Sequence, residues 1–305
     1  MLLNKRIPLK YLFNKIGPDL TITFIVIISV VLVEETLQYD LSLPIAIPAF
    51  LGTSISLVLS FKLSQSYGRW WEARKIWGAI VNDSRSLVLQ SKQFIKSNPE
   101  LENQLQYIAY NQIAWCFTLN NALRKEKNQL VYNKYIHQND QVKVEMGLHK
   151  PLRISDLLSQ HFRTLKSKDL LSDYQQIKLQ STLTNLVASM GMAERIKNTV
   201  FPITYRLFLR LFIHIFIFAL VISMSDVVSI SNHIKWIFDS ILVLIIILPF
   251  LLLEKTAYHI QDPFENRPMD TPTSAISKTI ERNLLELIDE KLPEQDDESD
   301  HYYVL

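Results

Sequence analysis

The chain has 305 residues, a hydrophobic fraction of 48% and a formal net charge of +2, so its overall charge gives no argument for nucleic acid or acidic lipid as a partner. Its single cysteine, Cys116, excludes an internal disulfide framework and any metal site built from several cysteines. Six glycines are too few for a glycine-rich nucleotide-binding fold with many tight turns, and we expect no cofactor.

Residues 1–19 are predicted to be a cytosolic N-terminus, and the first transmembrane helix is predicted to follow them. Four basic residues precede an apolar run from Leu20 to Val33. Glu34 and Glu35 follow this run where a cleaved signal needs small residues, so we interpret it as an uncleaved helix. The run is roughly 14 residues long, and it reaches the usual ~20 only by extending past the glutamates. Basic residues before it and acidic residues after it predict a cytosolic N-terminus.

The stretch from Pro48 to Gly78 reads as one long helix that starts in the bilayer, because its charges and tryptophans are concentrated in its last part. The row Thr53, Leu57, Phe61 and Gln65 lines a pore if the adjacent small residues pack against other copies of the chain. The alternative is a hairpin helix with Leu57 and Phe61 in an ordinary core. Small residues, which let helix backbones approach closely in lipid, recur at every fourth position: Gly52, Ser56, Ser60, Ser64 and Gly68.

Residues 82–202 have the pattern of soluble, cytosolic helices. Leu101, Leu105 and Ile108 recur at helical rather than alternating spacing. The polar stretch from Lys125 to Lys150 reads as an irregular connector between helices.

Two further apolar runs, Leu207 to Met224 and Ile234 to Leu253, are close to bilayer length. The linker from Ser225 to His233 carries no lysine or arginine, which suits the outer side of the membrane. We therefore predict an all-α membrane protein with four transmembrane helices and both termini cytosolic. Helices 1 and 2 lie within residues 20–81, helices 3 and 4 lie within residues 203–256, and residues 257–305 form a cytosolic segment with an acidic tail.

Signatures of enzymes and metal sites are missing from the sequence. It contains no phosphate-binding loop, no HExxH, no GxSxG and no cysteine–histidine spacing suited to zinc. The acidic residues form no pair placed by sequence for acid–base chemistry. We therefore predict a protein that is not an enzyme and holds no metal.

Three motifs, SYGRWWEARKIWG, GMAERIKNTVFPITY and HIQDPFEN, occur in an order and spacing that resemble the bestrophin family, in particular its bacterial members. The resemblance covers nearly the whole chain. Val200 stands where the family pattern leads us to expect proline, which affects only a local turn. The residues that carry the resemblance are Arg69, Trp70, Trp71, Glu72, Arg74, Glu194, Arg195, Asn198, Pro202, Asp262, Pro263 and Phe264.

The resemblance implies a homopentamer with four transmembrane helices per subunit, a helical cytosolic vestibule and a hydrophobic pore neck on the second helix. It places the neck at Thr53, Leu57 and Phe61, where Thr53 is polar although the family tends to be aliphatic. A second, cytosolic constriction falls near Tyr174 to Lys178. Eukaryotic members bind calcium through acids after the Pro-Phe pair, but Asn266, Arg267 and Pro268 occupy those positions here, so we predict no calcium clasp.

The predicted function is a passive channel of the inner (plasma) membrane that conducts anions such as chloride, with inorganic ions and the lipid bilayer as its partners. Lys62 adjoins the neck and favours anions such as chloride if it faces the pore, although it could instead lie between subunits. A cation (sodium)-selective channel of the same architecture is the alternative reading. A membrane-bound enzyme and a non-conducting membrane scaffold are more remote alternatives.

Overall fold

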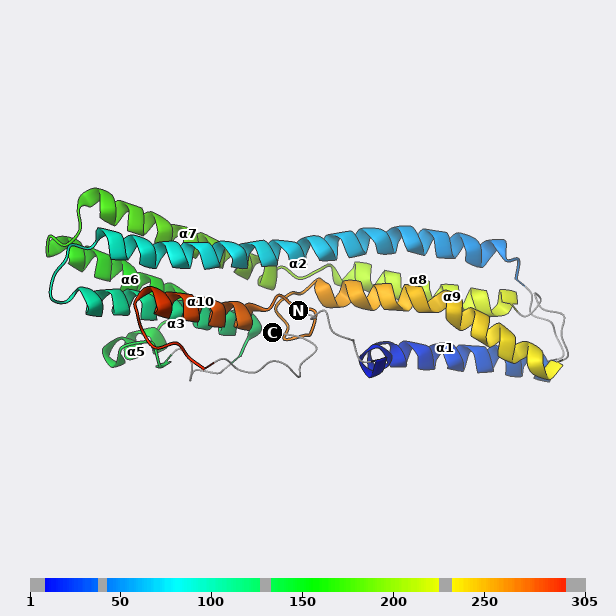
Figure 1. Ribbon diagram of the computed structural model, residues 1–305. Coiled ribbons are helices and arrows are strands. Elements are labelled where there is room, and N and C mark those ends of the chain that lie inside the picture. Colours follow the sequence, from blue (N-terminus) through cyan, green and yellow to red (C-terminus); the bar gives the residue numbers. More distant parts are fainter. Residues whose placement is uncertain (1–8, 38–42, 127–132, 225–231, 295–305) are drawn as a thin grey trace. The chain divides into compact units, whose positions relative to one another are not determined.

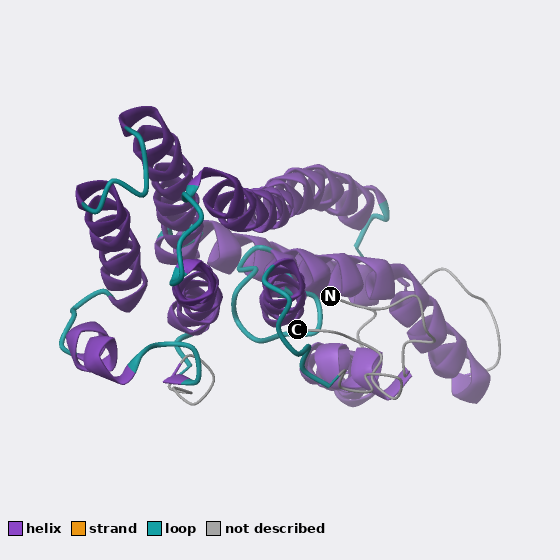
Figure 2. Ribbon diagram, turned by 60° about the vertical axis from the view of Figure 1, so that its left-hand side comes forward, coloured by secondary structure: helices purple, strands orange, loops and turns teal. Residues whose placement is uncertain are grey.

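The computed structural model describes residues 9–37, 43–126, 133–224 and 232–294, and within these ranges every regular element is a helix (Figures 1 and 2). The chain divides into two compact units. The polar unit comprises Trp70–Thr199 and Asp262–Leu305, and the apolar unit comprises Lys5–Arg69 and Val200–Gln261. The all-helical fold class is therefore confirmed for the described residues.

The polar unit is arranged around α3 (Leu101–Arg124). Every residue from 111 to 120 is buried, which is the pattern of a helix surrounded by other helices. Leu105 and Ile108 lie in its core, as their helical spacing predicts. Helices α6 (Lys150–Ser167), α7 (Asp173–Asn198) and α10 (Thr273–Leu287) pack against α3, and α6 also contacts α5 (Gln138–Glu145) and α7.

Helices α7 and α6 of the polar unit begin with side-chain caps that satisfy backbone N–H groups of their first turns. At α7, Ser172 Oγ accepts from Gln175 N at 3.4 Å, and the Gln175 side chain accepts from Ser172 N at 2.8 Å, which completes a capping box. At α6, the His149 imidazole accepts from Leu152 N at 3.2 Å. These caps define where both helices start.

The apolar unit consists of α1 (Leu9–Leu37), the first part of α2 (Ala46–Phe94), α8 (Ile203–Met224) and α9 (Asn232–Ile260). Helix α8 packs against α9, and α1 packs against both. Ile213, Phe216 and Ile247 lie in its core, while Phe208 and Ile245 are exposed. Large exposed apolar side chains on helices of this length are typical of lipid-facing surfaces.

Three helices of the described residues are long and apolar enough to cross a membrane: Ala46–Phe94, Ile203–Met224 and Ile237–Ile260. Helix α1 has 29 residues but is not among these three. These apolar helices indicate a membrane protein. The predicted fourth span would have to be α1.

Helix α2 is longer than the sequence predicts at both ends, with 49 residues from Ala46 to Phe94. Pro48 lies in its first turn, where the missing N–H has no intrahelical partner to lose. Beyond Gly78 the helix continues because Ile80 and Leu87 are fully buried in the core of the polar unit.

The stretch from Lys125 to Lys150, predicted as an irregular connector, differs from the prediction because it contains the short helix α5. Tyr107 Oη donates to Asp140 Oδ2 at 3.0 Å, which ties α5 to α3. Residues 225–231 of the predicted outer linker, Ser225 to His233, and the acidic tail from residue 295 lie outside the described residues, whereas Asn232 and His233 belong to α9.

Candidate functional site

The first part of α2 has one buried face and one exposed face. Ile55 and Leu59 are each 2% exposed, whereas Leu57 is 61% and Phe61 60% exposed, and Thr53 is also exposed. Leu57 and Phe61 are therefore not buried in a core formed within this chain, which disagrees with that part of the hairpin alternative. Their assignment to a pore neck stays a prediction.

The small residues of α2 do not all have the same surroundings. Gly52 is buried, and a Cβ placed on it would lie 3.2 Å from Phe216 Cε2, so this position packs tightly within the chain. Ser56, Ser60 and Ser64 are exposed, and Ser56 Oγ donates to Gly52 O at 2.8 Å. Bonding back to the preceding turn satisfies the Ser56 hydroxyl without a partner helix.

Lys62 does not present a charge on the exposed face of α2. Its side chain is 0% exposed, and its Nζ lies 3.1 Å from Oε1 of Glu254 on α9, whose side chain is 5% exposed. The expectation that Lys62 adds a charge beside the neck is corrected by this geometry, because its ammonium is buried and neutralised within the subunit. Sequence reasoning missed Glu254 as its partner, although Lys62 is a single charge within an apolar stretch and Glu254 directly follows one.

The three sequence motifs meet in the polar unit. Trp70 Nε1 donates to Met269 O at 3.0 Å and joins the first motif to the segment after the third. Arg195 Nη2 lies 2.8 Å from Glu72 Oε1 and joins the second motif to the first. Residues far apart in the sequence therefore form one connected set.

Further contacts extend this set to the third motif and to α6. Lys197 Nζ donates to Phe264 O at 3.0 Å, and Glu194 Oε1 lies 2.6 Å from Nε2 of His149. In the apolar unit, Arg69 Nε donates to Gln261 O at 2.8 Å. The remaining motif residues differ in burial: Pro263 is buried, Arg74 and Asp262 are half-buried, and Trp71, Asn198 and Pro202 are exposed.

The loop after α9 is held by a buried acid and a buried base. Asp270 Oδ2 accepts from the backbone N–H groups of Glu265 at 2.6 Å and Arg267 at 3.1 Å. The Arg124 guanidinium of α3 donates to Thr271 O at 3.2 Å. Burial lowers the pKa of Arg124 and raises the pKa of the Asp270 carboxyl.

This loop is where a calcium clasp would lie if the chain had one. Arg124 also donates to Asn266 Oδ1, so an arginine occupies the space beside that side chain. Among the residues that the structure describes, no group of three or more histidines, cysteines or acids is arranged to hold a metal ion. Sequence reasoning missed Arg124, because nothing in its local pattern distinguishes it from a surface arginine.

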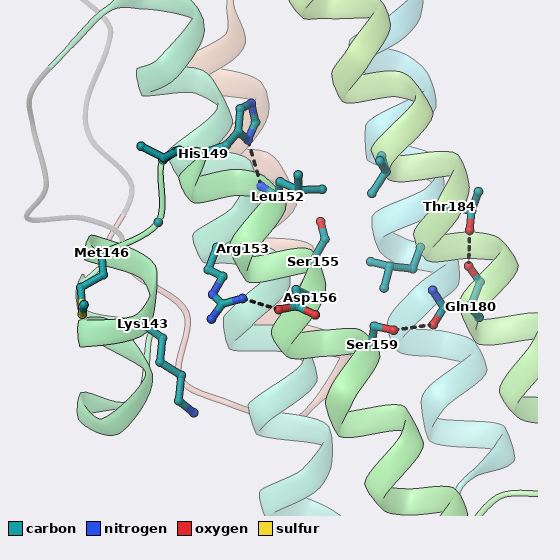
Figure 3. Close-up of a pocket in the computed structure, with 14 residues that line it drawn as sticks. Lys143, Met146, His149, Leu152, Arg153, Ser155, Asp156, Ser159, Gln180 and Thr184 are labelled. Carbon is teal, nitrogen blue, oxygen red and sulfur yellow. Dashed lines mark hydrogen bonds and ion pairs between the residues drawn. The ribbon is translucent and has the colours of Figure 1, made fainter.

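A groove of about 890 Å³ lies between α5, α6 and α7 (Figure 3). Its charged side chains are already paired within the chain: Arg153 Nη1 lies 2.7 Å from Asp156 Oδ2. Figure 3 also shows Ser159 Oγ donating to Gln180 Oε1, at 3.0 Å. Since these groups neutralise or satisfy one another, the groove defines no charge pattern that would select a ligand.

The fold and the α2 geometry define a helical membrane protein in which one long helix carries exposed apolar side chains along one face. Residues 10–286 match the family described as Bacterial/Fungal Bestrophin protein. The chain therefore belongs to the bacterial and fungal bestrophin family, as its three motifs predict.

Relatives and solved structures agree with this membership. The chain is 27% identical, over 83% of its length and 81% of the relative's, to a voltage-dependent anion channel-forming protein of Nostoc sp.. It is 28% identical, over 91% of its length and 88% of the relative's, to the voltage-dependent anion channel-forming protein YneE of Escherichia coli. A bacterial bestrophin homologue from Klebsiella pneumoniae has the same fold, with a TM-score of 0.79, 24% identity and coverage of 92% of this chain and 99% of that chain.

Proposed function

We propose that this chain forms a homopentameric ion channel that passively conducts anions such as chloride through a pore lined by α2. The observation that carries the proposal is the exposed row on α2, where Leu57 and Phe61 are 61% and 60% exposed in a helix that otherwise buries one face. Apolar side chains at a water-filled axis create a hydrophobic constriction. In this proposal Thr53, Leu57 and Phe61 form the neck.

The proposed subunit has four spans, with α1 as the first. A helix of 29 residues is about 44 Å long at 1.5 Å per residue, which exceeds the ~30 Å hydrocarbon core. An even number of spans puts both termini on one side, and the basic N-terminal residues favour the cytosol. The polar unit then forms the cytosolic part of an inner-membrane protein, with segment boundaries near residues 19, 81, 202 and 256.

The neck would gate by dewetting. Rings of leucine and phenylalanine narrow the pore until water leaves it, and a small rotation of α2 rewets it because wetting depends steeply on radius. No covalent step is involved, so the proposed activity is transport and not enzymatic catalysis. A second constriction near Tyr174 to Lys178 is part of the proposal, and it is supported by Tyr174 and Ile177 being 86% and 66% exposed at the start of α7.

Anion conduction is supported by the names of the Nostoc and Escherichia coli relatives. The buried pairing of Lys62 with Glu254 removes the nearest positive charge that would favour anions at the neck. This observation keeps a sodium-selective channel of the same architecture as the second candidate. Selectivity would then depend on charges outside the apolar neck.

The test is ion flux in planar bilayers containing the purified protein. Under asymmetric sodium chloride, an anion channel reverses near the chloride equilibrium potential and a sodium channel near the sodium equilibrium potential. Reversal near the sodium potential would replace the anion assignment with the second candidate. Pentamers that show no current under any gradient would refute the channel and favour a non-conducting scaffold.

A further inference from the structure

The buried face of α2 in the apolar unit contains a charged residue among apolar ones. Ile55, Leu59 and Lys62 follow one another at helical spacing, and all three are nearly or fully buried. A buried ammonium is costly in a membrane segment unless an opposite charge neutralises it. Glu254 supplies that charge at 3.1 Å.

Helix α9 carries two adjacent opposite charges that pair with two different helices. Glu254 pairs with Lys62 of α2, and Lys255 Nζ lies 2.7 Å from Asp19 Oδ2 of α1. Both Lys255 and Asp19 are mostly buried, with side chains 15% and 11% exposed. The two ion pairs therefore join α9 to α2 and to α1.

The position of Lys62 around the helix is tied to the direction of the exposed row. Residues advance about 100° each around an α-helix. Lys62 therefore lies about 100° from Phe61, about 140° from Leu57 and about 180° from Thr53. When Lys62 points toward α9, the exposed row of Thr53, Leu57 and Phe61 therefore points about 100–180° away from α9.

Neighbouring contacts of α2 constrain its rotation less specifically. Tyr205 Oη donates to the backbone oxygen of Val58 at 2.9 Å, and Leu59 packs in the apolar core. Apolar packing is non-directional, whereas separating two buried opposite charges leaves each of them uncompensated. The Lys62–Glu254 pair is therefore the contact on this face that most strongly opposes rotation.

We propose that Lys62 and Glu254 are positioning residues of the conduction path, whose ion pair sets the rotation of α2 and so turns Leu57 and Phe61 toward the pore. The proposal rests on the proposed function, because it takes the exposed row as the neck. Neither residue contacts the permeating ion. They act through the helix that carries the neck.

The test measures the orientation of α2 directly by cysteine labelling. Leu57→Cys and Ser56→Cys proteins are reconstituted in liposomes and treated with a membrane-impermeant, charged thiol reagent. The native Cys116 is fully buried, so protein without an introduced cysteine gives the background rate. With the pair intact, we expect faster labelling at Leu57→Cys than at Ser56→Cys, which lies about 100° away.

Breaking the pair should lower the ratio of these two rates several-fold. Lys62→Met and the milder Glu254→Gln are both tested, and only protein that elutes as the intact oligomer is compared. The double exchange Lys62→Glu with Glu254→Lys should restore the ratio, which a general loss of packing would not do. Lys75→Met, at an exposed lysine of the same helix in the polar unit, is the matched control and should leave the ratio unchanged.

The outcomes separate the two proposals. Fast labelling at Leu57→Cys with a ratio that neither variant changes would overturn the positioning role and leave the channel proposal standing. No labelling at Leu57→Cys with the pair intact would overturn the neck assignment itself. A lowered ratio that the charge exchange fails to restore would also count against the ion pair.

Discussion

Leu57 and Leu59 are chemically identical residues two positions apart on α2, yet their side chains are 61% and 2% exposed. Replacing each with alanine therefore separates a role in the pore from a role in packing. Full burial of a leucine contributes about 1.5–3 kcal/mol. With roughly two-fifths of its surface buried, Leu57→Ala should cost about 1 kcal/mol in stability, whereas Leu59→Ala adds a cavity and should cost about 3–5 kcal/mol.

The effects on conduction should have the opposite order. In planar bilayers, Leu57→Ala combined with Phe61→Ala should give a larger and less gated conductance, because the neck is widened and wetted more easily. Leu59→Ala should lower the unfolding temperature in detergent and leave the unitary conductance unchanged. Equal stability losses at Leu57 and Leu59, or currents unchanged in the double variant, would refute the assignment of the two faces.

Three further predictions concern the polar unit. Arg124→Met should lower the free energy of unfolding by about 2–4 kcal/mol in chemical denaturation, because it leaves buried acceptors and the Asp270 carboxylate unmatched; an unchanged midpoint would contradict this. Burial lowers the pKa of His161 to about 4, so the folded state binds fewer protons and stability should fall by up to about 3 kcal/mol between pH 6.5 and 4. His161→Phe, which keeps a ring against Tyr107, should flatten that dependence, and an unaltered acid limb would rule out this residue as its source. Burial raises the pKa of Cys116 to about 12, so a thiol reagent at neutral pH should label it only as fast as the protein unfolds, and rapid labelling of native protein would contradict its placement.

Much of the fold can be read from local pattern. The spacing of Leu101, Leu105 and Ile108 predicts a helix, and the structure has α3 there. The uninterrupted apolar runs predict α8 and most of α9. Helix ends were less predictable from the sequence. Helix α2 continues past Gly78 because Ile80 and Leu87 pack into a core formed by segments distant in the sequence.

Family membership could also be inferred from the sequence, since three motifs in order are more specific than any one of them. Their contacts could not be inferred in the same way. The Glu72–Arg195 pair joins residues 123 positions apart, and the Trp70–Met269 hydrogen bond joins residues 199 positions apart. The sequence around a residue does not indicate which distant residue its side chain will contact in the folded protein.

Thr53, Leu57 and Phe61 can be placed on one side of a helix from their spacing alone, because helical periodicity depends only on position along the chain. That this side is exposed, and that Lys62 is not part of it, is evident only in the folded subunit. The reason is that burial and charge pairing depend on groups brought together by folding, and the partner of Lys62 lies 192 residues away. A lysine next to the proposed neck in sequence is therefore a buried, neutralised contact in the folded subunit.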